Sequence, residues 1–194
     1  MLMTLPALVT GVNVVFAHDT EVALVAAAAL VNTSDRGVEH LPDLAALDRF
    51  FEMYGWTGRR ARTPAELRAV QELRPRLRRL WEADEDEVVE IVNTLLREAN
   101  ALPQLVRHDG WPYHLHATPP DAPLASRMAV EAAMAFVDVV RDGQLDRLRI
   151  CELPDCDNVV VDLTRNRSKR FCEAGCGNRA AVSAYRARKA ALGR

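Results

Sequence analysis

The chain has 194 residues, of which 49% are hydrophobic, and its formal net charge is −2. This length fits one domain, or one domain with a small module, and the apolar content excludes a chain that is disordered throughout. The near-neutral charge hides a division, because the residues from Thr164 onward include nine Lys or Arg and one acidic residue, Glu173. The end of the chain is therefore about +8 and the rest about −10, which is typical of a basic module that meets a polyanion.

The first segments predict a strand at residues 12–16 and then a buried helix over 20–31, which ends in turn-forming residues from Asn32 to Asp35. No Lys or Arg precedes Arg36, so the positive region of a secretory signal is missing. The apolar run over 22–31 is far shorter than the ~20 residues that span a bilayer. We therefore expect a cytoplasmic protein without a membrane partner.

Two further helices follow in the stretch "LPDLAALDRFFEMYG" and after Thr63. In the first, Pro42 suits the opening turn and Gly55 the position just past the end, and the expected apolar face holds Leu44, Leu47, Phe51 and Tyr54. In the second, Thr63 and Glu66 form a capping box with Pro64 at the first helical position. Pro75 predicts a kink or break in this second helix.

The stretch "DEDEVVEIVNTLLREANAL" predicts a helix capped by Asp84, with Glu87 three residues later. The acidic residues at 84–87 suit the positive end of a helix dipole, and a cation site is the alternative. A last helix of this region is expected in "APLASRMAVEAAMAFVDVVRDG", with Asp142 and Gly143 as its stop. The fold class is therefore mainly α, with a helical regulatory or sensor domain over residues 1–145.

A short strand is predicted at "WPYHLHATPP", where His114 and His116 alternate with apolar residues. Two histidines on one strand face can bind a metal or an anion, or they can be the solvated face of a hairpin. Together with Asn32 and Asp35 they are the candidates for a ligand site, or for catalysis, in the helical domain. No sequence pattern brings the four together and no nucleophile motif is present, so we do not expect an enzyme.

All four cysteines lie in the last quarter of the chain: Cys151, Cys156, Cys172 and Cys176. The spacing C-x4-C, fifteen residues, C-x3-C suits one tetrahedral zinc ion, and four thiolates leave no open position, so the zinc would be structural. A redox pair or two disulfides are the alternatives, but neither pair is C-x-x-C and an oxidising compartment is not indicated. We expect a treble-clef-like module over 146–194, with "NVVVDL" and "KRFC" as a hairpin before a helix.

The basic residues of this module predict a nucleic-acid interface. Two or three of them, such as Arg170 and Arg179, can offset the charge of a zinc–thiolate centre. The last helix is expected to pack one stripe, around Ala181, Val182, Ala184 and Tyr185, on the hairpin and to turn its basic stripe outward. The candidate nucleic-acid contacts are Arg165, Arg167, Lys169, Arg170, Arg179, Arg186, Arg188 and Lys189.

The stretches "VDLTRNRSKRFC" and "CGNR", at Cys176, Gly177, Asn178 and Arg179, resemble the CGNR zinc finger family of bacterial regulators. "ALVNTSD" at 29–35 is similar to the early part of the stress-induced regulator domain that precedes this finger. The resemblance implies zinc on the four cysteines and DNA contact by the surrounding basic residues. It also implies a tight turn at Gly177, a cap-like hydrogen bond from Asn178, and a phosphate or structural contact for Arg179.

We therefore expect a bacterial transcription regulator whose finger binds DNA and whose helical domain senses a signal, such as a small-molecule effector, or forms a homodimer. The alternative is a zinc-stabilised module that binds an acidic protein and has no DNA affinity, since such folds serve several functions.

Overall fold

The computed structural model describes residues 15–107, 110 and 112–192, and shows a mainly α-helical fold with small antiparallel hairpins. The expected strand at 12–16 falls largely on residues outside this part; Val15 and Phe16 form a bend. No helix of the described part is both long and apolar enough to cross a bilayer. The helices are α1 (His18–Val31), α2 (Leu44–Met53), α3 (Pro64–Glu82), α4 (Glu85–Glu98), α5 (Leu124–Arg141), the 3₁₀ helix η1 (Leu145–Arg147) and α6 (Cys176–Leu192).

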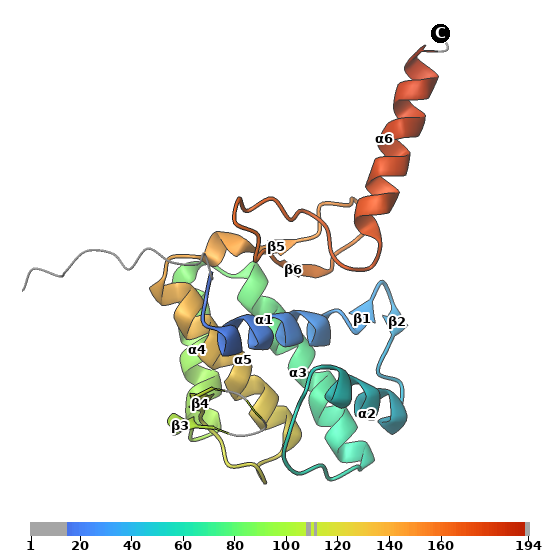
Figure 1. The fold of residues 1–194 in the computed structure, drawn as a ribbon. Helices are drawn as coiled ribbons and strands as arrows, with labels where there is room; N and C mark the ends of the chain where they lie inside the picture. Colours follow the sequence, from blue (N-terminus) through green and yellow to red (C-terminus); the bar gives the residue numbers. More distant parts are fainter. Residues whose placement is uncertain (1–14, 108–109, 111, 193–194) are drawn as a thin grey trace, which may run out of the picture.

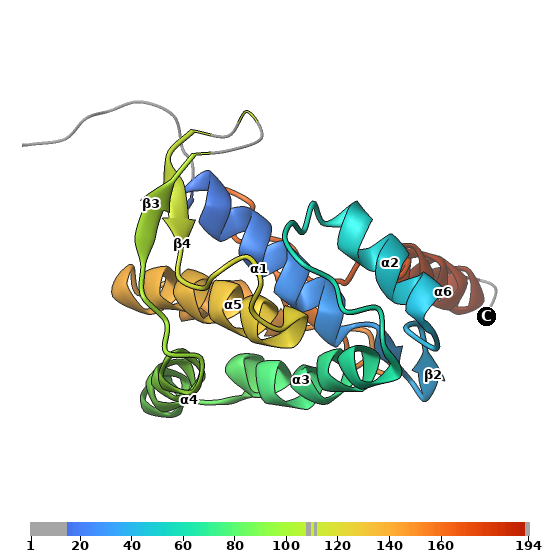
Figure 2. The ribbon, with the colours of Figure 1, turned by 90° about the horizontal axis from the view of Figure 1, so that it is seen from below.

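Three two-stranded antiparallel hairpins accompany these helices: β1 (Ser34–Asp35) with β2 (Val38–Glu39), β3 (Gln104–Val106) with β4 (His114–His116), and β5 (Leu148–Ile150) with β6 (Val159–Val161). The register places Leu105 opposite Leu115 and Arg149 opposite Val160. Figures 1 and 2 show the first two hairpins at the margins of the helical bundle and the third above it, next to α6.

Helix α5 is the centre of the bundle and packs against α1, α3 and α4 (Figure 2). Its residues Val130, Ala133, Phe136 and Val139 are fully buried, which the helical spacing of its apolar residues predicts. The ring of Phe136 meets the edge of Trp81 on α3, with ring centroids 5.1 Å apart. α1 is apolar on nearly all sides because it lies between the bundle and the third hairpin.

Both predicted caps are present, since the Thr63 hydroxyl accepts a hydrogen bond from Glu66 N at 3.2 Å and Asp84 accepts one from Glu87 N at 3.0 Å. Of the predicted kink or break at Pro75, the break is wrong, because α3 continues from residue 64 to 82; the kink stays a prediction. Pro75 leaves the Gln71 carbonyl without its usual backbone donor, and Arg74 Nε supplies a hydrogen bond to that carbonyl at 3.1 Å.

The buried face of α2 differs slightly from the predicted one. Ala46, Leu47 and Phe50 are buried, while Phe51 is only partly buried and packs on the core. Gly55 takes a positive φ of 64° just after α2, as its position predicts.

Candidate functional site

The four cysteines form one buried cluster, in which all four Sγ atoms lie within 4.8 Å of one another. Cys172 Sγ is 3.7 Å from Cys156 Sγ and 3.4 Å from Cys176 Sγ. Four sulfurs bound tetrahedrally to zinc at about 2.3 Å would be about 3.8 Å apart, so this donor set fits one zinc ion. All four ligand positions are filled by thiolates, which makes the ion structural, as predicted.

Local structure places each pair of cysteines. Cys151 and Cys156 lie on the loop that joins β5 to β6, where Cys156 N donates to Leu153 O and Cys151 N to Asn158 O. Cys172 precedes α6, and Cys176 is its first residue and has no exposed surface. A helix N-terminus favours negative charge on Cys176, since the first backbone N–H groups have no partner within the helix.

Neighbouring groups donate hydrogen bonds to the sulfurs and so stabilise the thiolate form. Asn158 Nδ2 lies 3.6 Å from Cys172 Sγ, Cys172 N lies 3.5 Å from Cys151 Sγ, and Arg179 Nη2 lies 3.0 Å from Cys176 Sγ. Burial raises the pKa of the Cys156 and Cys172 thiols. Burial acts in the same direction on Cys176, but hydrogen bonds, first from Arg179, outweigh it and lower its pKa.

The predicted second strand of the module, "KRFC", is wrong. β6 pairs instead with β5, which precedes the first cysteine, so the C-x4-C loop is the turn of the hairpin. The segment from Lys169 to Cys172 lies after β6 and does not form a strand. Two hydrogen bonds hold it instead: Glu152 N donates to Arg170 O, and Lys169 N donates to the Asp162 carboxylate. The helix that follows the hairpin begins at Cys176, as predicted.

Asp162 organises this segment and was missed by the sequence reasoning. Its side chain has no exposed surface, and its carboxylate accepts hydrogen bonds from Thr164 N at 2.9 Å, Thr164 Oγ1 at 2.5 Å and Lys169 N at 2.8 Å. Burial acts to raise the pKa of Asp162, but the bonds from Thr164 outweigh it and the pKa is lowered. The sequence contains a signal for this role of Asp162, since Asp-x-Thr after a strand is typical of an Asx turn.

The side chains on the two faces of β6 pack into two different hydrophobic cores. Val160 packs in the small cluster around the cysteines, with Phe171 partly covering it, whereas Val159 and Val161 belong to the main core of the helical bundle. The predicted division at residues 145 and 146 stays a prediction, but the two parts share one apolar core.

Polar side chains of the helical bundle also hold β6. Asn32, at the end of α1, donates from Nδ2 to Val159 O at 2.9 Å and accepts from Val159 N at 2.8 Å, as a neighbouring strand would. Trp81 Nε1 donates to Val160 O at 3.0 Å, and Arg78 donates to Asp157 O. The zinc module is therefore attached to the bundle by its backbone as well as by its apolar side chains.

The structure separates the four candidate ligand residues of the helical domain into two pairs. Asn32 and Asp35 lie beside the zinc module, where Asp35 pairs with Arg36 at 2.8 Å and is hydrogen-bonded to Asn158. His114 and His116 lie on β4, whose Leu115 N is hydrogen-bonded to Asp19 near the other end of α1. The Nε2 atoms of the two histidines are 2.9 Å apart, and His116 Nδ1 is 3.5 Å from Glu131 Oε1. No single site therefore contains all four.

Four of the eight candidate nucleic-acid contacts form ion pairs with acidic residues of the chain. Arg167 pairs with Asp146, Lys169 with Glu173 at 2.6 Å, Arg170 with Glu152 at 2.5 Å, and Arg179 with Asp155 at 3.3 Å. Arg179 also donates to Cys176 Sγ and so offsets the negative charge of the cysteine cluster, as expected. Arg170, the other residue expected in this role, lies instead over the Phe171 ring, 5.4 Å from its centroid. Within the described residues, the other four have no ion-pair partner: Arg165, Arg186, Arg188 and Lys189.

Helix α6 projects away from the rest of the molecule, as Figure 1 shows. Residues 181–191 are all exposed, including Val182 and Tyr185, so the predicted packing of one stripe on the hairpin is wrong. Arg179, Ser183 and Arg186 lie on one face of α6 and line a shallow hollow along the helix.

The "CGNR" residues begin this helix. Gly177 lies within α6 rather than in a tight turn, and the turn residue is Gly175, whose φ is 75°. A side chain at position 177 would meet the Phe171 ring at an ordinary contact distance of 3.7 Å. Asn178 is exposed on the first turn of α6.

Comparison with known families agrees with this geometry. Residues 147–189 match the CGNR zinc finger, and residues 24–143 match the family described as "Putative stress-induced transcription regulator". No curated protein matches the chain. The zinc finger match covers the four clustered cysteines, so the cofactor is one structural zinc ion. The other match covers more than half of the chain, and the protein therefore belongs to this stress-induced regulator family, with a CGNR zinc finger after its regulator domain.

Proposed function

We propose that the protein is a bacterial, cytoplasmic transcription regulator that binds double-stranded DNA through α6 and the adjoining basic surface of its zinc module. The observation that carries this proposal is the position of α6, a 17-residue helix that stands in solvent and carries Arg186, Arg188 and Lys189 without ion-pair partners. Unpaired cations on a projecting helix attract phosphate because binding releases the counterions of DNA. The proposal assigns no catalytic role to the chain.

The dimensions of α6 support contact with a duplex. Seventeen helical residues extend about 25 Å, and the major groove is about 12 Å wide, enough to admit a helix. The zinc ion fixes the start of α6 through Cys172 and Cys176, and Arg179 fixes it to Asp155. The helix is therefore presented in one orientation although its distal residues touch no other element.

The proposal is tested by fluorescence anisotropy of the zinc-loaded full chain on random-sequence duplex DNA between 50 and 200 mM salt. Each phosphate contact adds about −0.9 to the slope of log affinity against log salt concentration. We expect the double substitution Arg186→Ala with Arg188→Ala to weaken binding and to reduce the slope by about 2.

The matched control removes two exposed arginines of the helical domain, Arg49→Ala with Arg68→Ala, so the net charge changes equally. DNA affinity that falls equally in both double variants would reject α6 as the contact. A full chain that binds an acidic protein but no duplex at 50 mM salt would favour the alternative, a zinc-stabilised protein-binding module.

A further inference from the structure

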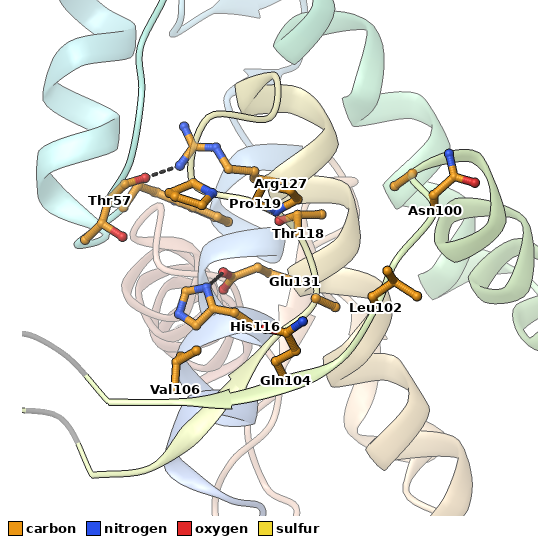
Figure 3. Close-up of a pocket in the computed structure, with 14 residues that line it drawn as sticks. Thr57, Asn100, Leu102, Gln104, Val106, His116, Thr118, Pro119, Arg127 and Glu131 are labelled. Carbon is orange, nitrogen blue, oxygen red and sulfur yellow. Dashed lines mark hydrogen bonds and ion pairs between the residues drawn. The ribbon is translucent and has the colours of Figure 1, made fainter.

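The helical domain contains a pocket of about 670 Å³ on the side of the bundle remote from the zinc module. Its walls come from the β3–β4 hairpin, α5, the end of α4 and the segments around residues 57 and 119 (Figure 3). A volume in this range holds a small organic ligand.

One wall of the pocket offers a hydrogen-bond donor. Trp56 lines the pocket, and its Nε1–H is buried with no hydrogen-bond partner among the described residues. Buried donors are nearly always satisfied, so an unpaired indole N–H at a pocket wall points to a ligand acceptor.

A buried positive charge lies beside this donor. Arg127 is only 5% exposed, and its guanidinium donates to three backbone carbonyls, those of Thr57, Arg59 and Ala122. Figure 3 shows the bond to Thr57. No described carboxylate forms an ion pair with it; Glu131 and Glu66 attract the charge only through space, and burial outweighs that attraction and lowers the pKa of Arg127. Hydrogen bonds to neutral carbonyls leave the charge without a carboxylate in contact, and a buried charge without a paired partner is costly. An anion in the pocket would supply a nearer negative charge than Glu131 or Glu66.

The remaining walls are mostly apolar, with Leu102, Val106, Pro119 and Pro120 around the space. The acidic side chain of the pocket, Glu131, is directed to His116, with 3.5 Å between Oε1 and Nδ1, and not to Arg127 (Figure 3). The pocket thus combines an apolar body, an unpaired donor and a buried cation with no carboxylate in contact.

We propose that this pocket binds a small amphipathic carboxylate, which would be the effector of the regulator. The ligand's apolar part lies along Leu102, Val106 and the prolines, and its carboxylate accepts a hydrogen bond from Trp56 Nε1 in the field of Arg127. Binding requires no DNA, so this inference can fail while the proposed DNA binding holds.

The test uses three probes that share one skeleton: 3-phenylpropanoate, 3-phenylpropanamide and 3-phenylpropylammonium. Each is titrated into the zinc-loaded full chain by calorimetry. We expect the carboxylate to bind with a dissociation constant near or below about 1 mM, about tenfold tighter than the neutral amide, and the ammonium to show no binding. Carboxylate affinity no greater than that of the amide or the ammonium, or no binding of any probe at 10 mM, would overturn the proposal.

Two substitutions should act in opposite directions. Trp56→Phe keeps an aromatic ring but removes the N–H, and should weaken carboxylate binding about tenfold. Glu131→Gln removes a negative charge from the pocket and should strengthen binding about threefold. Glu72→Gln is the charge-matched control, since Glu72 is exposed on α3 outside this pocket, and should change nothing. If Trp56→Phe fails to fold, Glu131→Gln alone decides, and unchanged or weaker binding in it counts against the proposal.

Discussion

Glu66 shows how a single carboxylate holds the loop before α3. Its oxygens accept hydrogen bonds from Ala61 N at 2.8 Å, Arg62 N at 3.0 Å and Arg60 Nε at 2.9 Å. In the predicted capping box the carboxylate would bind Thr63 N, and it instead binds backbone N–H groups one and two residues earlier. Burial acts to raise the pKa of Glu66, but the bonds from Ala61 and Arg60 outweigh it and hold the pKa below its ordinary value of 4.5.

We expect Glu66→Gln to lower the free energy of unfolding at pH 7 by about 1–3 kcal/mol, because the amide is a weaker acceptor for these donors. A lowered folded pKa means that the carboxylate stabilises the fold above pH 4.5 and that this contribution is lost as the pH falls through the folded value. The difference from wild type should therefore shrink in acid, as measured by urea unfolding from pH 7 down to 3.5. Glu72→Gln on the same helix is the control, and a difference independent of pH would contradict this account.

Helix α6 is the element on which the functional proposal depends, and it contributes little to the fold. Its first turn is held at the zinc site through Cys176 and Arg179, whereas residues 181–191 are exposed. Exposed residues away from packing contacts have small effects on stability.

A chain that ends at Ala180 should therefore keep one zinc ion, and its thermal midpoint should stay within about 2 °C of the full chain. Elemental analysis and circular dichroism measure the two quantities. The same chain should have lost its DNA affinity. A midpoint lower by more than about 5 °C, or loss of zinc, would show that α6 packs on the module after all.

The elements that the sequence predicts well are those fixed by local chemistry. α3 and α4 begin where Thr63 and Asp84 cap them, and α5 ends before Gly143, because caps and stops act within a few residues. The zinc ligands are equally predictable, since their spacing is local.

Most of the errors concern contacts between distant residues, and Pro75 is the local exception. The partner of β6 lies before Cys151 rather than after it, and a strand pattern in "KRFC" does not say which segment it meets. Pro75 is tolerated because Arg74 reaches the Gln71 carbonyl, a side-chain contact that helix propensity does not contain. Asn32 is an ordinary turn residue by sequence, and its role at Val159 requires knowing that α1 lies beside β6. The pocket around Trp56 likewise combines four separate segments.

At the scale of the whole molecule, the zinc module and the helical bundle form one packed unit. Val159 and Val161 complete the core of the bundle, and Trp81 and Asn32 bond to the backbone of β6. Because zinc binding contributes to the folding of the module, it should also stabilise the bundle.

Removal of zinc by a chelator should therefore lower the thermal midpoint of the helical signal by more than about 5 °C, in one transition rather than two. Circular dichroism at 222 nm, before and after chelation, measures this shift. Cys172→Ser is the control, which should begin at the lowered midpoint and should not respond to the chelator. An unchanged helical midpoint after chelation of the wild-type chain would mean that the bundle is stable without the module.

The most direct test of the central claim, that zinc holds a basic helix for contact with DNA, compares the DNA affinity of the full zinc-loaded chain with that of Cys172→Ser. Both are measured by fluorescence anisotropy on the same duplex at 100 mM salt, with matched protein concentrations. The account predicts that the intact chain binds at least about tenfold more tightly, since the variant keeps every basic residue but loses the fixed start of α6. Equal affinity of the two chains would contradict it.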